Sequence, residues 1–300
     1  MGDLAEKRTV TIGGRLKFEP LDAVILTVLL FLTALIVFPF ISVVAISFAT
    51  QREALEARLL LFPTQPTIEN YYRLFQDGRI WVGYRTTLTI LFIGVPFNMF
   101  LTTSLAYGLS RLRFPGGRFF FFAILMTMLF SGGIVPLYLL MMQLGLINTI
   151  WSVILAYGVN TFYMIIMRTY FTTIPDSLIE SAKLDGAGEW RILFRIVLPL
   201  SMPIIATIIL FFSVDRWNEW FNAMIFIRRT HIVPLQLVLR NIVIDSRIVD
   251  TISMSGEWEV RFADGMKMAT IILTMLPIMC FFPFLQKYFV KGIMIGAIKA

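Results

Sequence analysis

Charged and amide side chains gather at the end of one long apolar segment, where residues 215–222 read Asp-Arg-Trp-Asn-Glu-Trp-Phe-Asn. If a helix continues through them, one of its faces carries Asp215, Asn218, Glu219 and Asn222. Ionisable groups at membrane depth usually face a bundle interior or a water-filled path. The neighbouring Trp217 and Trp220 could stack on sugars, although tryptophans near this depth more often anchor a span at the interface. Two interpretations stay open: lining of a translocation path, or anchoring together with pairing of Arg216 to Glu219 or Trp220.

Other polar groups inside the apolar segments carry weaker signals. Asn160 and Tyr163 could line the same path, but hydrogen bonding between packed helices is the commoner use of such groups. His231 is the only histidine and Cys280 the only cysteine, so we expect neither a metal site nor a serine–histidine hydrolase. Ser131-Gly132-Gly133 is interpreted as close helix packing or a hinge. The chain lacks the G-x-x-x-x-G-K-[ST] loop that cradles nucleotide phosphates, so we expect no catalytic residues and no cofactor in it.

A polar stretch over residues 180–199 separates two long apolar segments and has a pattern of its own. Pro175, Asp176 and Ser177 favour a helix start, and this helix can run to Leu184. Asp185-Gly186 ends it, because glycine adopts the left-handed conformation at no steric cost. A second helix can start near Ala187 and run toward Pro199, with one apolar face made of Trp190, Leu193, Phe194 and Val197. The pattern predicts a helix–glycine–helix elbow that lies against a membrane.

The same stretch resembles a known family motif. Glu180-Ser181-Ala182, then Gly186 after three residues, then Ile196-x-Leu198-Pro199 after nine more, is similar to the EAA loop of ABC-importer membrane subunits. Only Ser181 departs from the pattern, which has alanine there. In that family the elbow is the coupling helix, which sits in a groove of the ATP-hydrolysing subunit. The resemblance therefore implies an ATPase-coupling role for Glu180, Ser181, Ala182, Asp185, Gly186, Ala187, Leu198 and Pro199.

Composition and spans agree with a polytopic membrane protein. Apolar residues make up 58% of the 300-residue chain, whereas soluble domains contain about 45–50%. Six segments are long enough to cross a bilayer: 23–48, 86–109, 119–142, 150–168, 200–222 and 267–288. Both ends of a six-span chain lie on one side. A nine-residue loop that holds Arg111, Arg113 and Arg118 places this side, with the tail 1–22 and the elbow region 168–199, in the cytoplasm. The net charge of +7 thus indicates topology and not a nucleic-acid partner.

Two long outer loops and the C-terminal end complete the chain. The loops 49–85 and 223–267 are rich in charged and aromatic residues. In the resembling family the second of these loops reaches the extracytoplasmic solute-binding protein, here around residues 254–258, but a folded cap over the bundle fits it equally well. The end, residues 289–300, resembles the permease tail that reaches between the two ATPase subunits. This resemblance implies tail contacts for Gly292, Gly296 and Lys299, and the final Ala300 replaces the usual glycine.

The resemblance covers most of the chain and is strongest to carbohydrate-type permeases. It implies an all-α, six-helix type I ABC importer transmembrane domain, which sits in the bacterial plasma membrane and forms half of a heterodimeric pore. The implied partners are a second permease, an ATPase dimer that binds ATP and magnesium, a solute-binding protein and a sugar or oligosaccharide. Arg228, Arg229 and Arg240 would suit an acidic oligosaccharide, although such arginines are usually only solvated. The alternatives are an ion-coupled secondary transporter that uses Asp215 and Glu219, and a sensor or scaffold that moves no solute.

Overall fold

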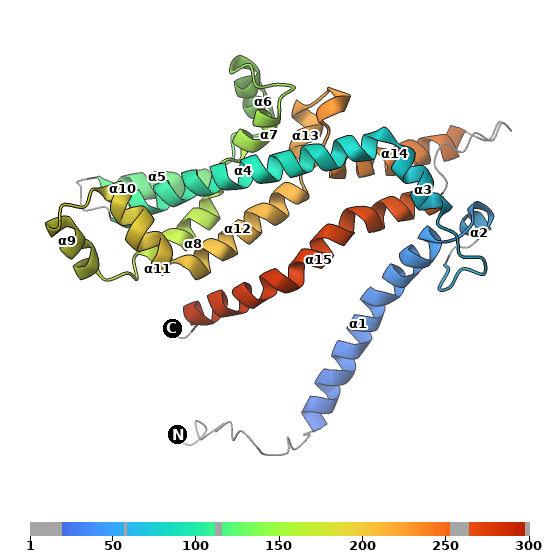
Figure 1. Cartoon of the computed structure of the whole chain (residues 1–300), viewed down its shortest axis with the longest axis horizontal. Coiled ribbons are helices and arrows are strands. Elements are labelled where there is room, and N and C mark those ends of the chain that lie inside the picture. Colours follow the sequence, from blue (N-terminus) through green and yellow to red (C-terminus); the bar gives the residue numbers. More distant parts are fainter. Residues whose placement is uncertain (1–19, 57–58, 112–115, 253–263, 298–300) are drawn as a thin grey trace.

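Long helices dominate the fold. The computed structural model describes residues 20–56, 59–111, 116–252 and 264–297, and every regular element among them is helical. Two unbroken helices are long and apolar enough to cross a membrane, α1 (Pro20–Ser47) and α4 (Gly78–Ser110). A third long helix, α15 (Asp264–Ala297), covers the sixth expected span. Figure 1 shows α15 beside α1 at one end and beside α12 along the bundle.

The other three expected spans are bent. Helix α5 (Gly117–Leu129) meets α6 (Ile134–Gln143) at 112°, and α7 (Ile150–Ala156) meets α8 (Thr161–Phe171) at 55°. The helical segment 189–200 meets α12 (Met202–Trp217) at 89°. At the first bend Gly133 has φ 85° and no atom lies within 4 Å of where its Cβ would be. The triplet Ser131-Gly132-Gly133 is therefore the non-helical break at which the span bends, and the close-packing interpretation does not apply to Gly133.

Helix ends differ from the expected spans for identifiable reasons. Helix α4 begins eight residues early because the Asp77 carboxylate accepts the backbone N–H of Arg79 at 2.9 Å and so caps it. Helix α15 continues through residues expected to form a separate tail, so Gly292 and Gly296 lie inside a helix. Lys299 lies outside the described residues. The fifth span, expected to reach residue 222, ends at Trp217.

The two outer loops contain short helices. They are α2 (Gln51–Glu56), α3 (Glu69–Gln76), α13 (Phe221–Phe226), the 3-10 turn η2 (Thr230–Ile232) and α14 (Leu235–Ile252). Buried Asn70 on α3 donates to the carbonyls of Ser47 and Ala49 at 3.0 and 2.9 Å. Gly265 at the start of α15 lies so close that a Cβ there would be 2.5 Å from Asn70 Nδ2. The first loop is thus a folded cap; residues 254–258 of the second lie outside the described chain.

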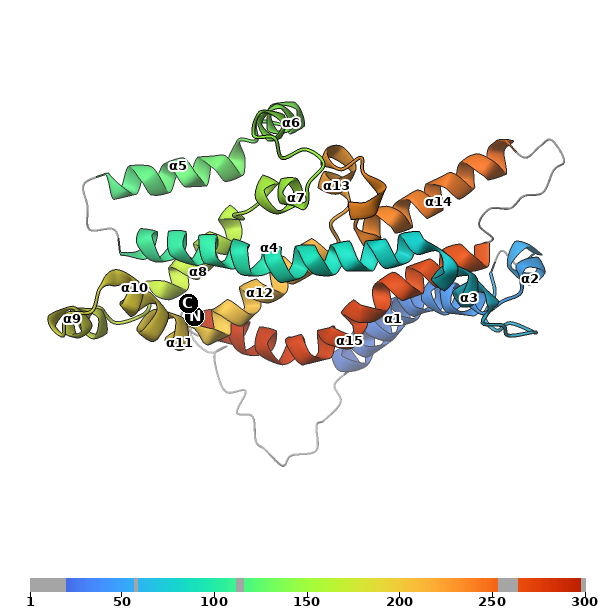
Figure 2. The same cartoon turned by 45° about the horizontal axis from the view of Figure 1, so that its top comes forward.

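The largest hydrophobic core surrounds α4, α8, α12 and the elbow. Its fully buried side chains include Met164, Met167, Phe171, Ile192 and Ile208. Helix α1, in contrast, exposes most of its length, as expected for a helix whose surroundings are lipid or another subunit. Figure 2 shows α4 running through the middle of the molecule, from the elbow at one end to α3 and α14 at the other. The core therefore joins the elbow to the transmembrane bundle.

Candidate functional site

The elbow begins with α9 (Asp176–Leu184), which spans the residues expected for its first helix. A Schellman motif ends it: Ala187 N–H donates to Ala182 O at 2.9 Å and Gly186 N–H to Lys183 O at 3.0 Å. This motif requires a left-handed residue, and Gly186 has φ 77°. Three of the expected coupling residues, Ala182, Gly186 and Ala187, are therefore the residues that build the turn itself.

The second half of the elbow differs from the expected helix. It starts at Glu189 instead of Ala187, with α10 (Glu189–Ile192), a π-helical turn η1 (Leu193–Val197) and α11 (Leu198–Leu200). Pro199 lacks an N–H and its ring crowds the carbonyl one turn earlier, so a wider turn before it is expected. Of the four apolar side chains assigned to one face, Leu193 and Val197 are buried. Trp190 and Phe194 are exposed and stack on each other, and Trp190 also stacks on Phe100 of α4.

Polar contacts tie both halves of the elbow to α4. Tyr107 Oη donates to Glu189 Oε2 at 2.6 Å, and Lys183 Nζ pairs with Glu189 Oε1 at 2.5 Å. Hydrogen bonds from Lys183 and then Tyr107 hold the pKa of Glu189 below its usual range. Arg111 at the end of α4 pairs with Asp176 at 2.7 Å. The base of the elbow is therefore attached to α4, a helix of 33 residues that runs through the middle of the molecule.

The other side of the elbow is open. Glu180, Ser181, Asp185 and Gly186 are exposed, and 89% of the Leu184 side chain is accessible. Leu198 is half-buried and Pro199 exposed. A single exposed leucine is ordinary for a protein surface; here it lies on a turn whose base is fixed by the contacts of Glu189 and Asp176. Some of the expected coupling residues therefore form the turn itself, and others lie on its exposed surface.

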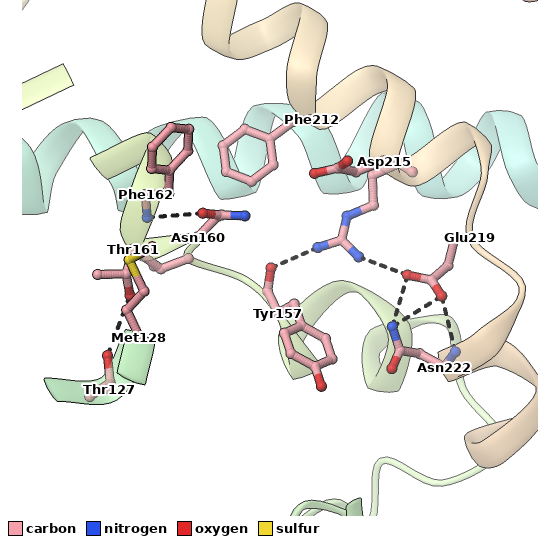
Figure 3. A pocket seen from close by; sticks show the side chains of 12 residues that line it. Thr127, Met128, Tyr157, Asn160, Thr161, Phe162, Phe212, Asp215, Glu219 and Asn222 are labelled. Atoms are coloured by element: carbon pink, nitrogen blue, oxygen red, sulfur yellow. Dashed lines mark hydrogen bonds and ion pairs between the residues drawn. The ribbon is translucent and has the colours of Figure 1, made fainter. Parts of the chain in front are cut away.

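A polar cavity of about 630 Å³ lies between the α7–α8 break, the end of α5 and the end of α12 (Figure 3). Polar side chains and exposed aromatic rings share its wall. The lining residues are Thr127, Met128, Tyr157, Val159, Asn160, Thr161, Phe162, Phe212, Asp215, Arg216, Glu219 and Asn222. Among the described residues no group of three His, Cys, Asp or Glu side chains could hold a metal ion.

The cavity is lined by three of the four residues that were expected to share one helix face, Asp215, Glu219 and Asn222, but they lie on different elements. The helix stops at Trp217, so no single helix face carries all four predicted residues. Glu219 turns back and accepts the N–H and the side-chain amide of Asn222, each at 3.0 Å, and so caps the start of α13. Asn218 leaves the cavity: its amide donates to Val214 O, and it accepts from Gln236 at 3.5 Å. The short break after α12 explains the difference.

Asn160 and Tyr163 lie at the same place on α8. The Asn160 side-chain oxygen accepts from the backbone N–H groups of Phe162 and Tyr163 at 3.0 and 3.3 Å and caps the helix. Tyr163 Oη donates to Asp215 Oδ2 at 2.9 Å and so joins α8 to α12, although Tyr163 does not itself line the cavity. Capping of α8 thus accounts for Asn160, which also borders the cavity, and a hydrogen bond between two helices accounts for Tyr163.

Two residues have positions that sequence reasoning missed. Trp217, considered as an anchor or a sugar platform, is buried in the bundle and donates to Thr274 O of α15 at 3.1 Å. Arg216 pairs with Glu219 at 3.5 Å, as one alternative had it, but it also donates to three backbone carbonyls at the end of α7. Two features of the sequence could have indicated this contact: an arginine inside one apolar segment, and Gly158, which interrupts another apolar segment.

Comparisons with known proteins decide the family. The family profile described as binding-protein-dependent transport system inner membrane component matches residues 11–295. The chain belongs to this family. The permease is 38% identical to the polygalacturonan/rhamnogalacturonan transport system permease protein YtcP of Bacillus subtilis, with 93% of this chain and 98% of the relative covered. It is 37% identical to Protein LplC of the same organism, with 89% and 90% covered.

A solved structure agrees with this assignment. The permease matches a chain of a bacterial ABC transporter involved in the import of the acidic polysaccharide alginate, with TM-score 0.81 and 29% identity. The match covers 91% of this permease and 99% of that chain. The expected all-α type I importer fold and the expected family are therefore confirmed, and the chain is a multi-pass inner-membrane protein.

Proposed function

We propose that this permease forms half of the membrane pathway of an ATP-driven importer for oligosaccharides that carry carboxylates. The named relative for polygalacturonan and rhamnogalacturonan and the structural neighbour for alginate both support a uronate-containing substrate. A companion permease completes the pathway and a solute-binding protein delivers the substrate. A partner ATPase binds ATP and magnesium, since this chain has no phosphate-cradling loop.

The observation that carries the proposed mechanism is the elbow. Its base is fixed to α4 through Glu189 and Asp176, and its open surface presents Leu184. A partner that pushes on this surface moves α4 with it, because the contacts of Glu189 and Asp176 join the elbow to α4 directly and not only through the connecting segments of the chain. The cavity has a volume within the range of about 300–1,000 Å³ that is usual for ligand pockets, and it combines hydrogen-bonding groups with exposed Tyr157 and Phe162 rings.

We further propose that both termini lie in the cytoplasm, on the side of the elbow. Figure 1 shows α15 ending near the elbow, and α1 running toward α3, which lies at the opposite end of the molecule from the elbow. Fusions of a cytoplasm-active and an export-active reporter to Ala300 test the orientation. The cytoplasmic reporter is expected to be active and the export reporter silent; the reverse pattern would overturn the proposed topology.

Reconstitution tests the function. The permease, its companion and the ATPase are placed in proteoliposomes, and the binding protein is added outside with a labelled galacturonate oligomer. Uptake is expected only when ATP is inside and the binding protein outside. A variant of the ATPase that binds ATP without hydrolysing it serves as the matched control. Uptake driven by an ion gradient without ATP would instead establish the secondary transporter, and binding without uptake the sensor.

A further inference from the structure

Arg216 is the cation that borders the cavity among the described residues. Its side chain is only 3% exposed. In an importer of acidic oligosaccharides, an arginine in the pathway is the obvious ligand for a substrate carboxylate, because its planar fork fits carboxylates well. The contacts of Arg216 point to a different role.

Acceptors within the permease surround every nitrogen of the Arg216 guanidinium. Nη1 donates to Val153 O at 2.9 Å and pairs with Glu219 at 3.5 Å. Nη2 donates to Ile154 O at 3.3 Å and to Tyr157 O at 2.9 Å. The Asn98 amide of α4, oriented with its oxygen toward the arginine, accepts from Nη2 at 2.7 Å and from Nε at 3.1 Å. An arginine has five N–H donors, so this set leaves none of them for a substrate.

These acceptors explain why the charge is needed. Helix α7 stops at Ala156 and α8 starts at Thr161, so the last carbonyls of α7 have no helical donor. Carbonyl groups without partners are costly at membrane depth, and the C-terminal end of a helix favours a cation. The Arg216 side chain alone supplies both the hydrogen-bond donors for these carbonyls and the positive charge at the end of the helix. It thereby links α12, α7 and α4 at the break.

We infer that Arg216 is a positioning residue for transport, which holds the α7–α8 break so that Tyr157 and Asn160 face the cavity. Resting on the proposed function, this inference separates Arg216 from the groups that bind the substrate. The wall of the cavity also carries the carboxylates of Asp215 and Glu219, so it presents acceptors to the sugar and no donor from Arg216.

The first test compares Arg216→Lys with Arg216→Gln in the complete reconstituted importer. Lysine keeps the positive charge but cannot reach several carbonyls and an amide at once. Both variants are expected to lower maximal uptake at least tenfold, and Arg85→Gln, at an exposed arginine of α4, is the matched control with unchanged uptake. Near-normal uptake by Arg216→Lys would overturn the inference, because charge alone would then suffice.

The second test reads the helix break without any transport. A Tyr157→Cys reporter is introduced into a Cys280→Ser chain in native membranes, and its labelling rate with a charged maleimide is measured. The rate is expected to change at least threefold when Arg216→Lys is added, and to stay constant when Arg85→Gln is added. An unchanged rate with Arg216→Lys would overturn the positioning role. If the wild-type importer moved no sugar, the proposed function would fail while this labelling test kept its meaning.

Discussion

Substitutions of Gly186 can distinguish two effects on transport: strain in the backbone of the elbow, and side-chain bulk at the surface where a partner would dock. Gly186 is left-handed with φ 77°, and no atom lies within 4 Å of where its Cβ would be. A side chain at this position therefore meets no obstacle inside the permease. The conformation itself costs a residue with a Cβ about 1–2 kcal/mol, except that asparagine adopts it more readily. This cost corresponds to a factor of about 5–30 in the population of the native turn.

Three variants follow from these numbers. Gly186→Ala carries the backbone cost with little bulk, and is expected to lower uptake by at most about fivefold to thirtyfold, a limit that is reached only where the native turn is weakly favoured over its alternatives. Gly186→Asn adds side-chain volume at a smaller cost for the left-handed backbone, whereas Gly186→Leu adds a large side chain and the full backbone cost. If the open surface docks on the ATPase, Gly186→Leu is expected to abolish uptake while the chain remains inserted and paired with its companion. Gly186→Asn then reports how closely the partner approaches.

The assay is ATP-dependent sugar uptake in proteoliposomes, with ATP hydrolysis measured in the same samples. Loss of uptake with retained hydrolysis identifies uncoupling, whereas loss of both with retained assembly identifies failed docking. Co-purification of the companion and the ATPase is the control for assembly. Wild-type uptake by Gly186→Leu would refute the coupling role of the elbow, since neither backbone strain nor bulk would then matter there.

Three further predictions concern single contacts. Tyr107→Phe and Glu189→Ala are each expected to reduce the sugar moved per ATP hydrolysed, and Glu189→Ala should have the larger effect because it also removes the Lys183 ion pair. Adding Tyr107→Phe to Glu189→Ala should change little, because the hydrogen bond between the two residues is already lost. Hydrogen bonds lower the pKa of Glu189. The stabilisation that the ionised Glu189 carboxylate provides is therefore complete above the ordinary carboxyl pKa of about 4.3, and it is lost as the pH falls through the lowered pKa of the folded state. The amount of sugar moved per ATP hydrolysed should accordingly not change between pH 8 and 6 through titration of Glu189. Asn70→Ala is expected to lower the free energy of unfolding by about 2–3 kcal/mol, because two buried carbonyls lose their donor, and the melting temperature in detergent checks this. Tyr163→Phe frees Asp215 from its donor and should change the apparent affinity for the sugar without changing basal ATP hydrolysis; identical uptake curves would contradict a place for Asp215 in the pathway.

Local signals in the sequence were enough for the elbow. The start at Asp176, the end at Leu184 and the left-handed glycine follow from residue types within a few positions of one another. The π-helical turn with its exposed Phe194, and the exposed Trp190 in α10 before it, did not follow, because they depend on Pro199 acting together with packing against Phe100 of α4. Periodicity assigns a face only where the helix keeps a constant number of residues per turn.

The breaks inside the spans show the same limit more clearly. Apolar runs over 119–142, 150–168 and 200–222 predict membrane segments, but composition does not reveal where each one bends. The bend after Ala156 depends on Arg216, which is some sixty residues away in the sequence. Arg216 also lines the cavity, which is assembled from α5, α7, α8 and α12, so the sequence alone predicted only some of the residues in its wall.

Helix α4 connects the elbow with the opposite end of the molecule, the two ends at which we propose that the importer meets its ATPase and its solute-binding protein. At the elbow end it holds Glu189 through Tyr107. At the other end the Thr87 hydroxyl accepts the N–H of Leu235 at 2.9 Å, and a Cβ on Gly83 would lie 3.0 Å from Leu235 Cα, so α14 rests directly on the α4 backbone. The helix has 33 residues and spans about 50 Å at 1.5 Å per residue. A displacement of the elbow therefore reaches the outer cap through one continuous element with contacts at both ends, which is what coupling of ATP hydrolysis to substrate entry requires.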